Sequence, residues 1–202
     1  MIAATYGEAR HIWEPFLVMT EPHRPALIGR WLGPGARLLQ RHELSVAASP
    51  ERAYNALLGA RFRDMPVVRL LFRLRRIPHT GEMTLRQFAA TPPFLVLQEE
   101  PPREIVFGVA GRFLPAARPR AEELPATLQE FRAFAESGAM RAIANFRVDA
   151  APGGARLSTE TWVETFGDRA RRLFALYWLI IGPFSALTRR EFLRAARQAA
   201  RE

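Results

Sequence analysis

A chain of 202 residues with an apolar fraction of 49% and a charged fraction of 24% has the composition of a globular domain, which excludes wholesale disorder. The net charge is +9, yet every basic residue is an arginine because the sequence contains no lysine. An arginine-only repertoire indicates a coding bias rather than a selected nucleic-acid surface, so we expect no nucleic-acid partner.

The residue types that are missing exclude several kinds of chemistry. Without cysteine there is no thiolate nucleophile, disulfide or thiolate metal site, and without lysine there is no Schiff base. The four histidines lie far apart, and no pair has the spacing of a zinc-binding helix: His11, His23, His42 and His79. No phosphate loop or nucleophile elbow occurs. We expect no metal and no cofactor.

The first residues lack the pattern of a secretory signal, because Glu8, Arg10 and Glu14 interrupt the zone that would have to be apolar. We therefore expect a cytoplasmic protein. Several prolines divide residues 1–38 into short apolar patches, which predicts an irregular N-terminal extension. We expect it to pack on the main domain, residues 39–202, through Trp13, Phe16 and Trp31.

The main domain is predicted to begin with a strand and two helices. Residues His42–Ala48 alternate as a strand does, and Ser49 followed by Pro50 is a typical helix start for a segment that runs toward Ala60. A second helix is predicted within residues 63–77.

The second helix is predicted to be amphipathic and basic. Its apolar arc holds Val67, Leu70, Leu71, Leu74 and Ile77, and the opposite arc holds Arg69, Arg73 and Arg76. We favour a solvated arginine face on the protein surface. The alternative is attraction to anionic lipid or phosphate.

Two hairpins are predicted next, and they imply an antiparallel sheet. "PFLVLQEE" and "EIVFGVAGRF" flank one turn signal, and "AIANFRVDA" and "ARLSTETWVETF" flank Pro152-Gly153-Gly154. Between the hairpins, residues 114–139 hold a proline-rich loop and a short helical pattern, "TLQEFRAFAES".

A tight turn in the second hairpin would place unlike residues on its two faces. The pairs expected on one face are Phe146–Thr161, Val148–Thr159 and Ala144–Val163. This apolar face with two hydroxyls suits a core or a pocket. The pairs expected on the other face are Arg147–Glu160 and Asn145–Trp162. That charged face suits solvent and a cross-strand ion pair.

Residues 173–187 carry no charge and lie between paired arginines. The stretch is shorter than the ~20 apolar residues of a membrane span, and Gly182-Pro183 interrupts it. A helix that is apolar on every side is expected to be buried on every side, so we predict that an antiparallel sheet wraps around it. Pro183 is expected to kink or divide the helix, and a more polar, basic section should follow from Thr188 to Arg201.

This order of elements resembles the START-like superfamily, also called SRPBCC, which includes polyketide cyclases and lipid-transfer domains. The resemblance covers roughly residues 40–200 and is carried mainly by "VAASPERAYNAL" and "ARLSTETWVETFGDRARRLFALYW", neither of which is a catalytic signature. It implies an α+β helix-grip fold, in which the sheet wraps around a long C-terminal helix and a cavity lies between the two.

The resemblance also implies that the cavity holds an apolar small molecule. The expected ligand-binding residues are Phe107, Val109, Phe146, Thr159, Thr161, Phe174, Tyr177 and Trp178, and the alternative for each is ordinary core packing. No catalytic residue is assigned.

Three functions are compatible with these sequence features. We favour binding or transfer of a hydrophobic molecule, because the expected walls are apolar with a few hydroxyls. A cyclase or dehydratase would need an acid or base in the cavity, for which Glu160 or His79 could serve only if the face assignment above is wrong. The third function is weak contact with a membrane surface through the 63–77 helix and the arginine-rich C-terminus.

Overall fold

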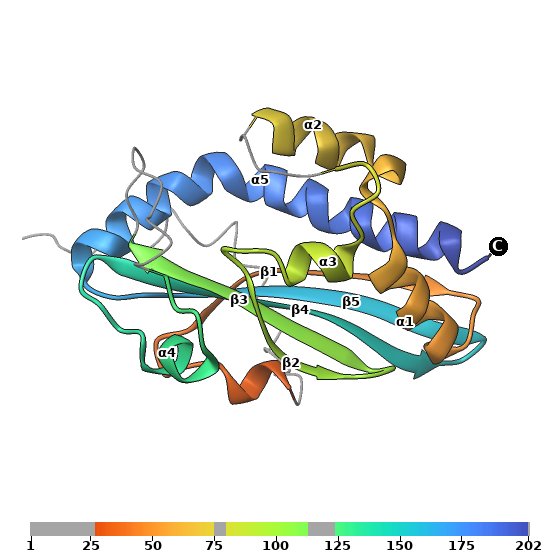
Figure 1. The fold of residues 1–202 in the computed structure, drawn as a ribbon, viewed down its shortest axis with the longest axis horizontal. Helices are drawn as coiled ribbons and strands as arrows, with labels where there is room; N and C mark the ends of the chain where they lie inside the picture. The colour runs from red at the N-terminus through yellow and green to blue at the C-terminus, as the bar shows by residue number, and fades with distance from the viewer. Residues whose placement is uncertain (1–26, 75–79, 113–123, 202) are drawn as a thin grey trace, which may run out of the picture.

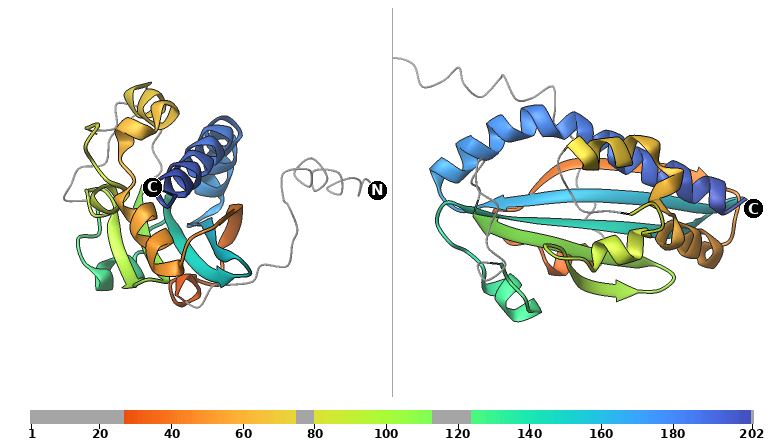
Figure 2. Two further views of the ribbon diagram at one scale, coloured as in Figure 1. Left: turned by 90° about the vertical axis from the view of Figure 1, so that its right-hand side faces the viewer. Right: turned by 45° about the horizontal axis from the view of Figure 1, so that its top comes forward.

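An antiparallel sheet of five strands carries one long helix across its inner face (Figure 1). The computed structural model describes residues 27–74, 80–112 and 124–201. The strands are β1 (Arg37–Val46), β2 (Leu95–Glu100), β3 (Glu104–Arg112), β4 (Ala139–Ala151) and β5 (Gly154–Thr165), in the spatial order β1-β5-β4-β3-β2. Helix α5 (Asp168–Ala199) follows β5 and arches over the sheet (Figures 1 and 2). The predicted α+β helix-grip class is confirmed.

Shorter helices cover the two faces of the sheet unequally. On the inner face, α1 (Pro50–Gly59), η4 (Phe62–Asp64), α2 (Pro66–Leu74) and α3 (Leu85–Ala89) pack beside the second half of α5. On the outer face lie the short 3-10 helix η3 (Ile28–Arg30) and α4 (Leu128–Ala133). Each face therefore has a hydrophobic core of its own.

The beginning of the main domain follows the sequence signals closely. The Ser49 side chain accepts a hydrogen bond of 3.3 Å from the backbone N–H of Arg52, and Pro50 is the first residue of α1. Tyr54 and Leu57 point from α1 into the core. Strand β1 begins at Arg37, earlier than the predicted His42, because it pairs along β5 as far as Val163.

Helix α2 begins at Pro66, later than predicted, and presents a different face to the core. Val68, Leu71 and Phe72 are buried, whereas Leu70 and Leu74, which we expected on the apolar arc, are exposed. The bulky Phe72 ring packs edge-on against Phe62, with centroids 5.4 Å apart, and so turns the helix. The expected positions Arg76 and Ile77 lie outside the described residues.

The inner core is built largely from phenylalanine rings. Phe107 and Phe146 stack with their centroids 5.9 Å apart, and Phe192 of α5 packs edge-on against Phe146 at 5.7 Å. Phe62 and Phe88 continue this cluster toward α2 and α3. The second half of α5 is thereby fixed to the sheet, since burial of each ring contributes roughly 1.5–3 kcal/mol.

We expected the outer face of the sheet to be exposed to solvent, but it is covered. Leu27, Ile28 and Trp31 pack on it together with Phe131 of α4, so Asn145 and Trp162 beneath them are buried. In the sheet alone these polar side chains would be exposed to solvent, but the segment before β1 covers them. The expectation was wrong because the covering residues lie far from β4 and β5 in the sequence.

The register of the second hairpin also differs from the prediction. Ala144 lies opposite Thr161, and Val148 lies opposite Leu157. The turn consists of Pro152 and Gly153, so Ala151 pairs with Gly154 and the pairing moves by two residues. Because a strand alternates its faces with a period of two, every side chain keeps its predicted face.

The first half of α5 is not buried on every side. Leu176 is 61% exposed and Ile180 is 67% exposed, although Phe174 is buried. The argument that an all-apolar helix must be wholly enclosed was therefore wrong, because only one stripe of this helix meets the sheet. Pro183 does not divide the helix, which runs unbroken from Asp168 to Ala199 and arches over the sheet (Figure 2).

Candidate functional site

The stripe of α5 that faces the sheet changes character along its length. It begins with Phe174 and Trp178, whose rings stack with centroids 5.8 Å apart. Two small residues follow at helical spacing, Gly182 and Ser185. Arg189 comes next, one turn before the buried core residues that begin at Phe192.

The part of the sheet below this change carries polar side chains. Gln40 and His42 of β1 lie opposite Thr161 and Thr159 of β5, respectively. All four share the inner face with Phe107 and Phe146. The Gln40 side chain donates a hydrogen bond to the hydroxyl of Ser185, which ties α5 to the edge of the sheet.

Arg189 extends from α5 into this region. Its guanidinium carbon lies 5.3 Å from the ring centroid of Phe146 and 5.5 Å from that of Phe107, so both rings make cation–π contacts with it. One nitrogen donates a hydrogen bond of 3.4 Å to Oγ1 of Thr159. Burial lowers the pKa of Arg189 to about 10, so the group remains charged at neutral pH.

The remaining polar groups of the cluster are uncharged, so its positive charge comes from Arg189. Burial lowers the pKa of His42, and the charges of Arg190 and Arg189 lower it further, which favours the neutral imidazole. The Thr159 hydroxyl donates to the backbone carbonyl of Asn145 at 2.7 Å. The Thr161 hydroxyl is buried and has no hydrogen-bond partner in the part of the chain that the structure describes. We call Gln40, His42, Thr159, Thr161, Ser185 and Arg189 the inner polar cluster.

The predicted ligand-binding residues all lie on the inner side, but in different surroundings. Phe107 and Phe146 are fully packed core rings, whereas Val109 is partly exposed beside them. Thr159 and Thr161 belong to the inner polar cluster. On α5, Phe174 is buried, and Tyr177 and Trp178 are partly buried. Their role in binding stays a prediction.

Sequence reasoning missed Arg189, Ser185, Gln40 and His42. A helical projection would have found Arg189, because eleven residues after Trp178 is close to three full turns and returns to the same stripe. Gln40 and His42 had no comparable signal. Their position depends on the pairing of β1 with β5, which joins the first strand to the last.

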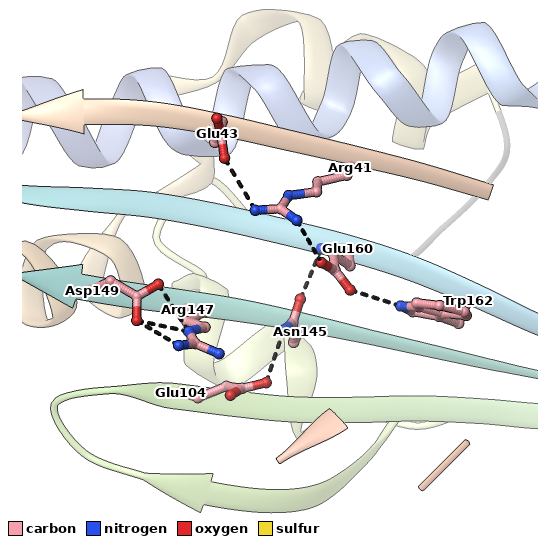
Figure 3. A network of polar contacts seen from close by, with 8 residues as sticks. All are labelled: Arg41, Glu43, Glu104, Asn145, Arg147, Asp149, Glu160 and Trp162. Carbon is pink, nitrogen blue, oxygen red and sulfur yellow. Dashed lines mark hydrogen bonds and ion pairs between the residues drawn. The ribbon is translucent and has the colours of Figure 1, made fainter. Parts of the chain in front are cut away.

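A second group of buried polar residues lies on the outer face (Figure 3). Asn145 joins two glutamate residues: its Nδ2 donates to the Glu104 carboxylate at Oε1, at 2.8 Å, and its Oδ1 accepts from the backbone N–H of Glu160 at 2.8 Å. Trp162 Nε1 donates to Oε2 of Glu160 at 2.8 Å, and a guanidinium nitrogen of Arg41 lies 3.6 Å from Oε1 of the same carboxylate. Burial raises the pKa of Glu160.

This outer network does not supply the acid or base that the enzyme alternative needs. Glu160 faces η3, on the side of the sheet away from α5. The predicted ion pair between Glu160 and Arg147 is absent, because Arg147 bonds to Asp149 of its own strand at 2.7 Å. His79, the other candidate, lies outside the described residues.

A hollow of about 390 Å³ lies at the far end of α5, beside Arg194, Arg197, Gln198 and Arg201. It is open to solvent, and its lining side chains are mostly exposed. Within the described ranges, no group of three His, Asp or Glu side chains is placed to hold a metal ion. We therefore place the candidate site at the inner polar cluster.

Comparison with known proteins finds similar structures but no matching family model or curated sequence. The chain is similar in structure to protein MLL2253 from Mesorhizobium loti, with 15% identity, a TM-score of 0.36, and 81% of this chain and 96% of that chain covered. It is also similar to protein CV1439 from Chromobacterium violaceum, with 15% identity, a TM-score of 0.37, and 84% of this chain and 99% of that chain covered.

A third similar structure is Ara h 8.0201, with 8% identity, a TM-score of 0.33, and 82% of this chain and 98% of that chain covered. The helix-grip assignment rests on the strand order and on the position of α5, and membership of the START-like superfamily stays a prediction. Among the described helices, none is long and apolar enough to cross a bilayer.

Proposed function

We propose that the protein binds an apolar small molecule between the first half of α5 and the inner face of the sheet. The observation that carries this proposal is the pair of small residues, Gly182 and Ser185, between the Trp178 ring and the packed core that begins at Phe192. At Gly182 the helix is bordered by the Trp178 indole, which lies 3.1 Å from where a Cβ would stand, and Ser185 reaches the sheet only through its hydrogen bond with Gln40. Neither residue places an apolar side chain of its own against the sheet.

The sheet opposite supports the same proposal. Val109 of β3 and Ala142 of β4 are direct neighbours on the inner face, and both remain partly exposed. Phe107, the neighbouring residue of β3 on the same face, is buried. Apolar surface that is left open beside a finished core, with a few hydroxyls at its edge, is typical of a small-molecule site.

Native mass spectrometry of the full chain, followed by thermal-shift titration with 1-dodecanol, tests the proposal. A bound ligand raises the melting temperature by an amount that grows with its concentration over its dissociation constant. Ala142→Phe should fill the open surface and abolish the shift. Ala150→Phe, on an exposed position of the same strand, is the matched control and should leave the shift unchanged. Equal shifts in both variants, or none in the wild type, would contradict the proposal.

A second candidate function is docking on an anionic membrane surface, with transfer of the ligand to or from it. The exposed stripe of α5 lies opposite its inner stripe and carries Leu176, Leu179, Ile180, Phe184 and Leu187. Arg172 and Arg190 extend the same face at either end. An apolar stripe between cations is the pattern of a helix that lies in the headgroup region.

Flotation with vesicles of phosphatidylcholine, with and without phosphatidylglycerol, tests the second candidate. We expect binding only to the anionic vesicles and less of it at high salt. Leu176→Gln with Ile180→Gln should remove binding, whereas Leu128→Gln, an exposed leucine of α4 on the outer side, should not. Concentration-dependent dimers that the double substitution abolishes, without flotation, would instead assign the stripe to a second copy of this chain.

A further inference from the structure

Arg189 differs from two other arginines that are not exposed, because they pair with carboxylates. Arg141 bonds to the carboxylate of Glu164, and Arg147 bonds to that of Asp149 at 2.7 Å. Among the described residues, no carboxylate pairs with Arg189, and the electrostatic cause that shifts its pKa is burial alone. Its polar contact there is the single 3.4 Å hydrogen bond to Thr159.

An unpaired guanidinium in such surroundings is unfavourable for the folded protein. Arg189 is partly buried, and the water that its charge loses on burial is a cost to folding unless an opposite charge and hydrogen bonds replace the lost hydration. Two phenyl rings and one long hydrogen bond replace little of it. Groups held in an unfavourable setting by a rigid scaffold are often functional, and the missing element here is an anion.

A hydroxyl that lacks a partner lies on the same surface. Thr161 is two residues from Thr159 on the same face of β5, so the two hydroxyls are about 7 Å apart. Thr161 also shares a cross-sheet row with Ala144 and Phe107, whose ring lies under the guanidinium. A ligand oxygen bound to Arg189 would therefore come within reach of the free hydroxyl of Thr161.

We propose that Arg189 and Thr161 bind the carboxylate of an amphipathic ligand whose apolar part extends along Val109 toward Trp178. This inference rests on the function proposed above and assigns the chemical class of the ligand. A carboxylate suits the site because its two oxygens accept the forked donors of a guanidinium and still have lone pairs for a hydroxyl. The neutral His42 beside it leaves Arg189 as the charge that selects the ligand.

The distance along the helix sets the size of the apolar part. Arg189 and Trp178 are eleven residues apart, which corresponds to roughly 16 Å along the axis of α5. A medium-length alkyl chain, extended from a head group at Arg189, spans that distance. Ser185 and Gly182 lie between, where bulkier side chains would obstruct the chain.

Two ligands with the same alkyl chain separate head-group recognition from apolar binding. Dodecanoate and 1-dodecanol are titrated at pH 8, below their aggregation limits, with tryptophan fluorescence as the readout. We expect the wild-type protein to prefer dodecanoate by about 10- to 100-fold, the gain expected for hydrogen bonds to a charged group. This comparison requires no variant. If neither compound binds, the proposed function fails; if both bind equally, that function stands and the carboxylate assignment is wrong.

Arg189→Met then tests which residue selects the head group. The variant should lose the preference for dodecanoate and bind 1-dodecanol within about threefold of the wild type, because only the ionic contact is removed. Its melting temperature should stay equal or rise, since an uncompensated charge is replaced by an apolar side chain. A residue with a merely structural role would lower it. Arg190→Met, on the exposed face, is the matched control and should keep the preference.

Thr161→Val provides an independent variant that removes one hydroxyl with little change of shape. It should weaken dodecanoate binding several-fold and leave 1-dodecanol binding unchanged. Retention of the full preference in both Arg189→Met and Thr161→Val would overturn the assignment. Dodecyl phosphate serves as a third ligand: tighter binding than dodecanoate would assign the site to a phosphate rather than a carboxylate.

Discussion

Arg141 and Glu164 lie directly opposite each other on β4 and β5 and form an ion pair on the outer face of the sheet. Arg141 also donates to the backbone carbonyls of Phe131 and Arg132, at 3.1 Å and 3.0 Å. Glu164 accepts from the backbone N–H of Gly35 at 3.3 Å. One buried pair therefore joins α4, the sheet and the segment before β1.

Arg141→Ala should destabilise the protein by about 3–5 kcal/mol, because it leaves the Glu164 carboxylate buried without its partner. Urea unfolding measures the loss. Arg112→Ala breaks an ion pair with Glu136 that is exposed on both sides, and should cost less than about 1 kcal/mol. Similar losses in the two variants would show that the Arg141–Glu164 pair does not hold α4 and the segment before β1 to the sheet.

The structure also predicts a difference between two aromatic residues that the sequence placed in the same pocket wall. Phe146 is fully buried between Phe107 and Phe192, so Phe146→Ala should cost about 3–5 kcal/mol. Trp178 is only partly buried, and Trp178→Ala should cost less than about 2 kcal/mol. Equal costs from urea unfolding would mean that Trp178 is an ordinary core residue and that the site beside it is closed.

These residues illustrate what the sequence could predict about the fold. Strand alternation and the cap at Ser49 are local signals, so the hairpins, the start of α1 and the face of each β5 residue were predicted correctly. The register was wrong by two residues, because a proline-glycine turn can close at either of two positions without changing any face.

The site was harder to predict because it depends on contacts between distant parts of the chain. Gln40 reaches Ser185 only because the first strand pairs with the last and α5 crosses both. Arg189 was assigned to a basic, polar section of the helix, since charge is usually a surface property. Burial of Glu160 beneath η3 likewise depends on a segment far away in the sequence.

The stability of the protein should depend on pH through His42. Burial and the neighbouring arginines hold its folded-state pKa below the ordinary value of 6.5. Above that value both the folded and unfolded chains hold neutral imidazole, and His42 has no effect. As the pH falls below it, the unfolded chain takes up the proton more readily, so the free energy of unfolding decreases and then levels off below the folded pKa.

His42→Gln removes this titration while it retains a polar side chain beside Gln40. The melting temperature of the wild type should therefore fall more than that of the variant between pH 8 and about pH 5. Glu160 has a raised pKa and acts with the opposite sign at lower pH, but it is present in both proteins and cancels in the comparison. Parallel profiles would show that His42 is freely solvated.

Gly182 should matter for binding more than for folding. A Cβ atom at this position would lie 3.1 Å from Nε1 of Trp178, so Gly182→Ala must move the indole ring by a few tenths of an ångström. Alanine is favoured over glycine within a helix by up to about 1 kcal/mol, which offsets the crowding. We expect a nearly unchanged melting temperature, altered tryptophan emission, and several-fold weaker binding of 1-dodecanol.

Gly59→Ala, near the end of α1 with no atom within 4 Å of the added Cβ, is the matched control. It should leave both emission and binding unchanged. If Gly182→Ala binds 1-dodecanol as the wild type does, the small residues of α5 do not border the ligand, and the apolar molecule must lie elsewhere on the inner face.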